Sequence, residues 1–109
     1  MNPNIAPDIF AVLPREKAFY FFTSIGNYTG VNASSLNEFA EKIREVNVKS
    51  LEFHLNRGDF EKWLTEVLQD TEIAEEIRKL KRLNLAGDDL RNHLCETVSR
   101  RLEHSKSPL

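Results

Sequence analysis

The apolar residues of this 109-residue chain are distributed differently on the two sides of residue 35. On the N-terminal side, an aromatic run at residues 18–23 is followed by Gly26 and Asn27 and then by a short run at residues 28–31. Aromatic and β-branched residues favour strands, and Gly and Asn tolerate the positive φ of a tight turn. This stretch therefore predicts an aromatic β-hairpin.

On the C-terminal side the apolar residues recur at helical spacing. Over residues 36–43 they follow the i, i+3, i+4, i+7 pattern of one helix face, and Ser35 with Glu38 forms a capping-box pattern at the start. Further apolar stripes predict four more helices, and these stripes begin at Val48, Phe60, Ile73 and Leu90.

The breaks between these helices are also readable in the sequence. We expect Asn47 to end the first helix and Gly58 to end the second in a left-handed conformation. Asp59, Asp70 and Asp88 each precede an apolar stripe, so we expect them to be the N-caps of the last three helices. The prediction is an α+β domain, predominantly helical, with about five short helices after the hairpin.

The two ends of the chain differ from this central part. Pro3, Pro7 and Pro14 predict an extended N-terminal arm at residues 1–15, followed by one globular domain at 16–104 and a frayed tail at 105–109. Apolar residues in the arm should lie on the domain or on a partner: Ile9, Phe10, Val12 and Leu13. A two-stranded hairpin is marginal alone, so it should pack on the helices or pair with a strand from the arm or a second copy.

Composition narrows the classes of protein to consider. The formal net charge of −2 and pI of about 5.9 argue against a dedicated nucleic-acid binder, which usually has a basic excess. Cys95 is the single cysteine, and the N-terminus lacks the pattern of a signal peptide. No apolar stretch approaches the roughly 20 residues that span a bilayer. We therefore expect a cytoplasmic protein without a membrane partner.

Residues 53–63 contain the greatest density of chemically specific side chains. One hypothesis places His54, Arg57 and Asp59 in one polar pocket beside an aromatic floor, with Trp63 as a further candidate binding residue. The structural alternative uses Gly58 to end one helix, Asp59 to cap the next and pair with Arg57, and Trp63 to fill the core. That alternative leaves His54 without a role.

A basic cluster follows at the end of the fourth predicted helix. Its four members are Arg78, Lys79, Lys81 and Arg82. Such a cluster is suited to phosphates or an acidic partner, and cations in a last helical turn also complement the helix dipole.

No residue pattern predicts a metal or a cofactor. The candidate ligands are His54, His93, Cys95 and His104, and His93 and Cys95 are two residues apart and so point in different directions on a helix. Cys95 adjoins an apolar stripe, which favours a buried, inert thiol over a nucleophile. Phosphate-binding loops, nucleophile elbows and HExxH motifs are absent, so we expect neither a cofactor nor a definable catalytic residue.

Two groups of residues resemble a family of small archaeal and bacterial proteins or domains of unknown function. The first runs from the aromatic strand through Tyr28-Thr29-Gly30 to Ser35-Leu36-Asn37-Glu38-Phe39. The second contains Phe53-His54, Arg57-Gly58-Asp59-Phe60, Trp63, Val67-Leu68-Gln69-Asp70 and Ile73-Ala74. The resemblance covers about residues 17–80. Gln69 replaces the usual glycine, and the resemblance implies a prokaryotic cytoplasmic source but no activity.

Three functions remain open at this point. The first is a non-enzymatic protein-interaction module, a homodimer or an accessory subunit, that uses the hairpin edge and the N-terminal arm. The second is a nucleic-acid-associated regulator that uses the helices around Gly58 as a helix-turn-helix with the basic cluster. The third is a small enzyme that uses His54 as acid or base. We favour the first and expect no catalytic activity.

Overall fold

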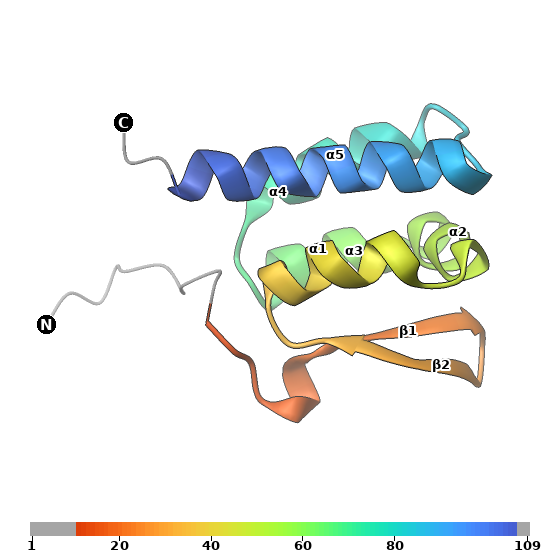
Figure 1. Cartoon of the computed structure of the whole chain (residues 1–109), viewed down its shortest axis with the longest axis horizontal. Coiled ribbons are helices and arrows are strands. Elements are labelled where there is room, and N and C mark those ends of the chain that lie inside the picture. Colours follow the sequence, from red (N-terminus) through yellow and green to blue (C-terminus); the bar gives the residue numbers. More distant parts are fainter. Residues whose placement is uncertain (1–10, 107–109) are drawn as a thin grey trace, which may run out of the picture.

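The computed structural model describes residues 11–106, with side chains as far as 104, and shows three layers (Figure 1). An antiparallel hairpin forms one outer layer and consists of β1 (Phe19–Ser24) and β2 (Asn27–Ala33). The middle layer contains α1 (Leu36–Glu45), α2 (Val48–Arg57) and α3 (Asp59–Glu66). The other outer layer contains α4 (Thr71–Lys81) and α5 (Gly87–Lys106).

This architecture confirms the predicted helical α+β fold with an N-terminal aromatic hairpin and five helices. The helix α5 is longer than expected, because its 20 residues extend through the first part of the predicted tail. A short 3-10 helix, η1 (Arg15–Lys17), precedes β1. The expectations for Pro3, Pro7, Ile9 and Phe10 lie outside the described residues, as do those for 107–109.

The hairpin owes its shape to two glycines. Gly26, at φ 82°, takes the left-handed position of the two-residue turn and leaves Ile25 at the other turn position. Further along, Phe21 pairs with Val31 while Phe22 pairs with Tyr28, so β2 bulges between these pairs, where Gly30 has a φ of 88°. β1 packs on α2 and β2 packs on α1, which confirms that the hairpin is supported by the helices.

Most helix boundaries follow the predicted signals. The Ser35 hydroxyl accepts a hydrogen bond from the Glu38 amide, and Asp70 accepts one from the Ile73 amide. Asn47 separates α1 from α2 and caps α2 through the Lys49 amide. These three starts have the side-chain acceptors that free helix amides require.

Two predicted caps are wrong. Gly58, at φ 77°, is the single residue between α2 and α3 and caps both, so Asp59 is already the first helical residue of α3. Because an N-cap needs an extended backbone, no position is left for a capping Asp59 in so short a link. Asp88 likewise lies within the first turn of α5, which begins at Gly87.

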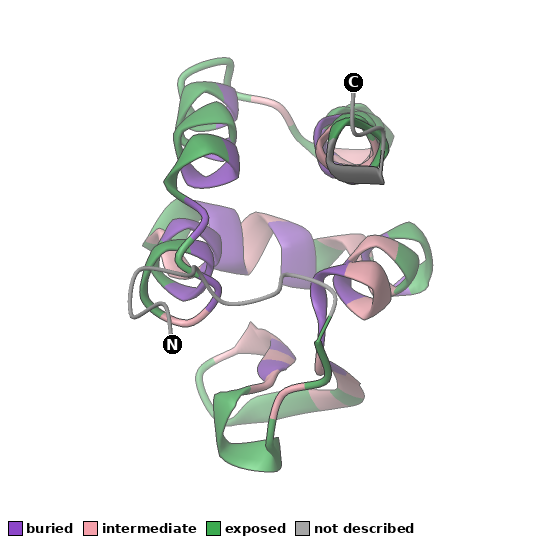
Figure 2. Ribbon diagram, turned by 90° about the vertical axis from the view of Figure 1, so that its left-hand side faces the viewer, coloured by how far each residue is buried: buried purple, intermediate pink, exposed green. Residues whose placement is uncertain are grey.

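The core lies between the layers, where the buried sides of the middle helices face both neighbours (Figure 2). Phe19 and Phe21 project from β1 into this core and their rings contact those of Phe39 and Phe60. Trp63 is buried, as predicted, and its indole N–H donates to the Lys17 carbonyl at 2.8 Å. Alternation along β1 therefore places Tyr20 and Phe22 on the opposite face of the strand.

Candidate functional site

His54 connects the hairpin to the helices. It lies on the buried side of α2, and its Nε2 accepts a hydrogen bond from the Phe22 amide at 2.8 Å. Since Nε2 is an acceptor, the ring proton is on Nδ1, which donates to Asp59 Oδ2 at 2.8 Å. The imidazole is therefore neutral, and both of its nitrogens are occupied.

Burial favours this neutral state. The pKa of His54 is lowered from its ordinary value mainly by loss of solvent, and the Arg57 charge lowers it further. Asp59 opposes this effect, because its hydrogen bond and its charge both favour the imidazolium ion. A proton on Nε2 would also face the N–H of Phe22, so protonation removes the link to β1.

Asp59 has a connecting role in place of the predicted cap. Its Oδ2 accepts from both His54 Nδ1 and Arg57 Nε, the latter at 3.0 Å. The pairing of Arg57 with Asp59 confirms the sequence prediction. The idea that His54 has no structural role is wrong, because the short link at Gly58 brings the first residue of α3 back against the last turn of α2.

Arg57 lies at the edge of this network. Its guanidinium carbon is 5.1 Å from the centre of the Phe53 ring, in a cation–π arrangement. Its side chain is half exposed, and only its Nε is hydrogen-bonded among the described residues. Arg57 therefore presents its outer nitrogens beside an aromatic surface.

A pocket of about 320 Å³ opens next to these groups. We call it the hairpin pocket; its main walls are Tyr20, Phe22 and Ile25 of the hairpin and Phe53, His54 and Arg57 of α2. Its walls are mostly aromatic or aliphatic, both nitrogens of His54 are hydrogen-bonded, and Arg57 is paired with Asp59 through its Nε. Such a pocket is suited to an apolar group and offers no free acid or base.

The hairpin has an exposed surface that continues from this pocket. We call it the hairpin face and define it by Tyr20, Phe22, Ile25 and Tyr28. The Tyr28 ring centre lies 5.7 Å from that of Tyr20 and 5.4 Å from that of Phe22. Ile25 is 82% exposed and Tyr28 is 44% exposed, so this apolar surface faces solvent.

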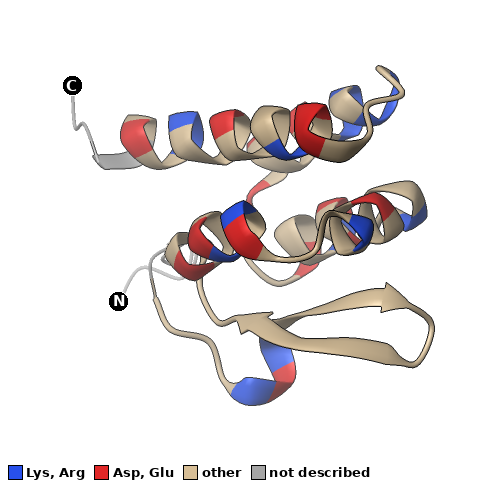
Figure 3. Ribbon diagram, turned by 45° about the vertical axis from the view of Figure 1, so that its right-hand side comes forward, with Lys and Arg blue, Asp and Glu red and all other residues tan. Residues whose placement is uncertain are grey.

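The hairpin is the one layer of the three that has no charged side chains. Residues 18–37 contain no Asp, Glu, Lys or Arg, whereas 29% of the chain is charged. Figure 3 shows the hairpin without a coloured segment, while charged residues mark every helix of the other two layers. The exposed apolar hairpin face thus has no charges to keep it hydrated.

The predicted basic cluster is spread over an exposed helix end and is partly neutralised. Arg78 pairs with Glu75 and Lys79 pairs with Glu76, while Lys81 and Arg82 are exposed. The exposed side chains of α3 are similarly mixed in charge: Lys62, Thr65 and Glu66. Neither the cluster nor buried Trp63 is part of the hairpin pocket, whereas His54, Arg57 and Asp59 all line it.

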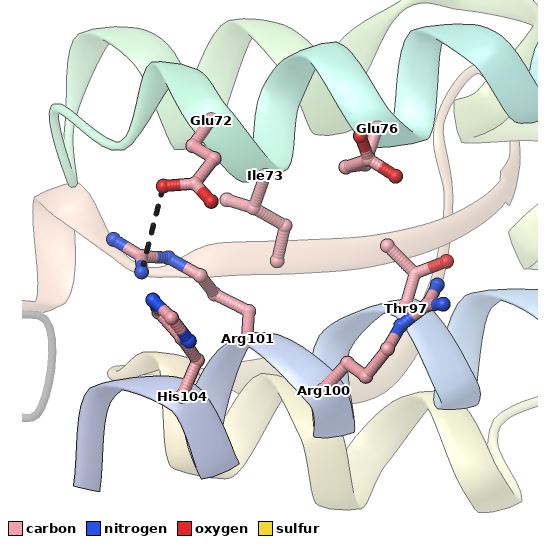
Figure 4. Close-up of a pocket in the computed structure, with 7 residues that line it drawn as sticks. All are labelled: Glu72, Ile73, Glu76, Thr97, Arg100, Arg101 and His104. Atoms are coloured by element: carbon pink, nitrogen blue, oxygen red, sulfur yellow. Dashed lines mark ion pairs between the residues drawn. The ribbon is translucent and has the colours of Figure 1, made fainter. Parts of the chain in front are cut away.

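A second pocket of about 310 Å³ lies between α4 and α5 (Figure 4). Acidic side chains of α4 and basic side chains of α5 point towards each other across it. Arg101 Nε is 2.8 Å from the buried Asp70 carboxylate, and its Nη1 is 3.7 Å from Glu72. Because these charges hold α5 against the start of α4, we interpret the arrangement as structural.

Other candidate groups in the described part of the chain do not form a site. No set of three or more His, Cys, Asp or Glu residues is arranged to hold a metal within residues 11–106. Burial raises the pKa of the half-buried Cys95 thiol, which opposes its reactivity as a thiolate. Two buried oxygens of the described residues lack hydrogen-bond partners, Ser50 Oγ and Glu61 Oε1, and both are outside the hairpin pocket.

Within the described chain, no helix combines the length and apolar character needed to cross a membrane.

The sequence contained a signal for the hairpin face that residue types alone did not reveal. Alternation along β1 separates Phe19 and Phe21 from Tyr20 and Phe22, and the uncharged run spans the same segment. Phe53 lines the pocket only because α2 packs against β1. The local sequence does not specify this packing.

Comparisons of the chain with protein-family models, with curated proteins and with solved structures found no match.

Proposed function

We propose that this protein is a non-enzymatic interaction module that binds a protein partner through its hairpin face. The observation that carries the proposal is an exposed aromatic and aliphatic surface in the one layer that lacks charge. Contiguous exposed apolar surface favours association, and aromatic residues contribute much of the energy of protein interfaces. The proposed setting is the cytoplasm, and the likeness to the uncharacterised prokaryotic family is retained as part of this proposal.

The geometry of His54 favours binding over catalysis. A general acid or base needs a nitrogen within reach of a substrate. Both nitrogens of His54 are engaged, with Phe22 and with Asp59. The hairpin pocket therefore offers shape and apolar contact, which suit recognition of a partner.

The ion pairs of α4 favour the same choice over nucleic-acid binding. Phosphate contacts need unpaired cations gathered on one surface. Two of the four cations in the basic cluster instead pair with Glu75 and Glu76, one turn away. The hairpin face is the more distinctive surface of the molecule.

Photo-cross-linking in living cells tests the proposal. A photoreactive phenylalanine analogue is placed at Ile25 in one variant and at Leu83, which is 56% exposed, in a matched variant. Leu83 follows α4, in the outer layer opposite the hairpin (Figure 1). We expect a discrete protein adduct from position 25 and none from position 83.

A second substitution checks that the adduct depends on the surface. Adding Tyr28→Asp should abolish the adduct at position 25, because it introduces a charge into the apolar contact. Equal adducts from both positions, or none from position 25, would contradict the proposed function.

A further inference from the structure

We infer that the partner of the hairpin face is a second copy of this chain, and that Ile25 of each copy occupies the hairpin pocket of the other. The inference rests on the proposed function and specifies its partner. It differs from strand pairing at the hairpin edge, because the contact uses side chains of the hairpin face and not the backbone of β2.

A projecting side chain, Ile25, and a cavity, the hairpin pocket, lie next to each other. Ile25 occupies the tip of the hairpin and is 82% exposed, while it also forms one rim of the hairpin pocket. A two-fold dimer requires one self-complementary patch, in which a residue contacts a second residue and is contacted by its equivalent. A projection beside a cavity meets this requirement, because one rotation inserts both projections together.

The second argument concerns chemical fit. The pocket of about 320 Å³ has the aromatic side chains of Tyr20, Phe22 and Phe53 in its walls. These walls match the branched aliphatic side chain of Ile25, and its insertion removes apolar surface of both copies from water. His54 borders the pocket as a neutral ring, and the charged Arg57 and Asp59 beside it are paired with each other.

The third argument concerns charge. The chain has a formal net charge of −2, so two copies repel one another when they approach at random. The uncharged segment 18–37 is the part of the surface where they can approach without placing like charges together. At the pocket, Arg57 and Asp59 are already paired within each copy, so neither requires a partner's charge.

Sedimentation velocity of the purified chain over a range of concentrations tests the inference. We expect the wild-type chain to dimerise reversibly. Ile25→Asp should weaken dimerisation at least about tenfold, since it places a charge in an apolar cavity. Leu83→Asp is the matched control, because it makes the same exposed aliphatic-to-acid change in the opposite layer and should leave the dimer intact.

A substitution in the cavity tests the other half of the contact. Ser24 also lines the hairpin pocket and is only partly buried, so Ser24→Trp fills the cavity from its rim. We expect this variant to be monomeric at concentrations where the Leu83→Asp variant is a dimer. Unchanged thermal unfolding of Ile25→Asp shows that loss of the dimer is not loss of the fold.

Two results would overturn the inference. One is a wild-type chain that remains a monomer at about 1 mM, a concentration at which even a very weak specific contact is populated. The other is an Ile25→Asp variant that dimerises as the wild type does.

The cross-linking experiment separates this inference from the proposed function. A monomeric chain whose position 25 cross-links to a different protein overturns self-docking and leaves the proposed function in place. A monomeric chain without any adduct at position 25 overturns both.

Discussion

The two outer layers of this molecule are stabilised by different interactions. The hairpin is attached by aromatic packing and by a neutral imidazole, through the Phe22–His54 and His54–Asp59 hydrogen bonds. The α4–α5 layer packs on the middle helices through buried apolar residues, and a buried ion pair between Asp70 and Arg101 holds α5 against the start of α4.

The exposed surfaces of the two outer layers also differ in charge. Charged side chains of both signs cover α4 and α5, and several of them are paired (Figure 3). The hairpin face exposes Ile25 and Tyr28 to solvent but has no charge. Charge on a water-facing element keeps a protein soluble, so its absence from an exposed layer is the basis of the proposal that this surface binds a partner. Four experiments test this difference between the two layers.

The largest effect should come from the ion pair. Asp70→Ala removes the partner of Arg101 and the acceptor that caps α4 at Ile73. We expect the free energy of unfolding to fall by about 3 kcal/mol, as measured by denaturant titration. Asp88→Ala is the control, because Asp88 is exposed and should change stability by less than about 0.5 kcal/mol. Equal effects would show that the ion pair does not hold this layer.

A smaller loss should follow when the imidazole link is removed. His54→Leu leaves the Phe22 amide without an acceptor and deprives Asp59 of a donor, so we expect a loss of about 2 kcal/mol. His54→Gln offers an oxygen that can accept from Phe22 and should recover part of this loss. Equal stability of the wild type and the leucine variant in denaturant titrations would contradict the proposed link.

Lowering the pH should weaken the attachment of the hairpin layer through His54, without any mutation. Because the pKa of folded His54 is lowered, the unfolded chain binds a proton first as pH falls below about 6.5. His54 therefore contributes stability above that pH, which is lost as pH falls towards the folded pKa. The slope attributable to this residue is at most about 1.4 kcal/mol per pH unit. Unfolding measured from pH 7.5 downwards should show this slope in the wild type and not in His54→Gln.

The smallest effect concerns the turn that leads into the outer helical layer. Gln69 has a φ of 55°, a conformation that costs a non-glycine residue roughly 1 kcal/mol. Gln69→Gly should therefore stabilise the chain by about 0.5–1 kcal/mol and raise the thermal midpoint. Asn84→Gly is the matched control, because Asn84 has a similar φ of 54°. Asparagine tolerates this region, so this substitution should stabilise the chain less than Gln69→Gly does. A loss of stability in Gln69→Gly would contradict this interpretation.

The fold was largely predictable because local chemistry specifies it. Ser35, Asn47 and Asp70 mark helix starts with side chains that accept from free amides, and Gly58 ends α2 in the expected left-handed conformation. Asp59 was misjudged because the same residue type serves as a cap or as an ion-pair partner. Its role depends on Gly58 being the only residue between two helices.

The candidate site was less predictable because it forms between distant segments. Arg57 and Asp59 are two residues apart, and their pairing was foreseen. The bond between Phe22 and His54 joins residues 32 positions apart, and no local pattern indicates that an imidazole will accept from a strand amide. The hairpin pocket needs the same long-range contact, so it appears only once β1 is packed on α2.

Amide NMR spectra recorded over a dilution series test the central claim most directly, because one experiment reports on both outer layers. We expect concentration-dependent chemical-shift changes at residues 20–28 and at Phe53 and Arg57. The amide shifts of Leu83 and α4 should not change with concentration. Shifts concentrated in α4 and α5, or no concentration dependence at the hairpin, would contradict it.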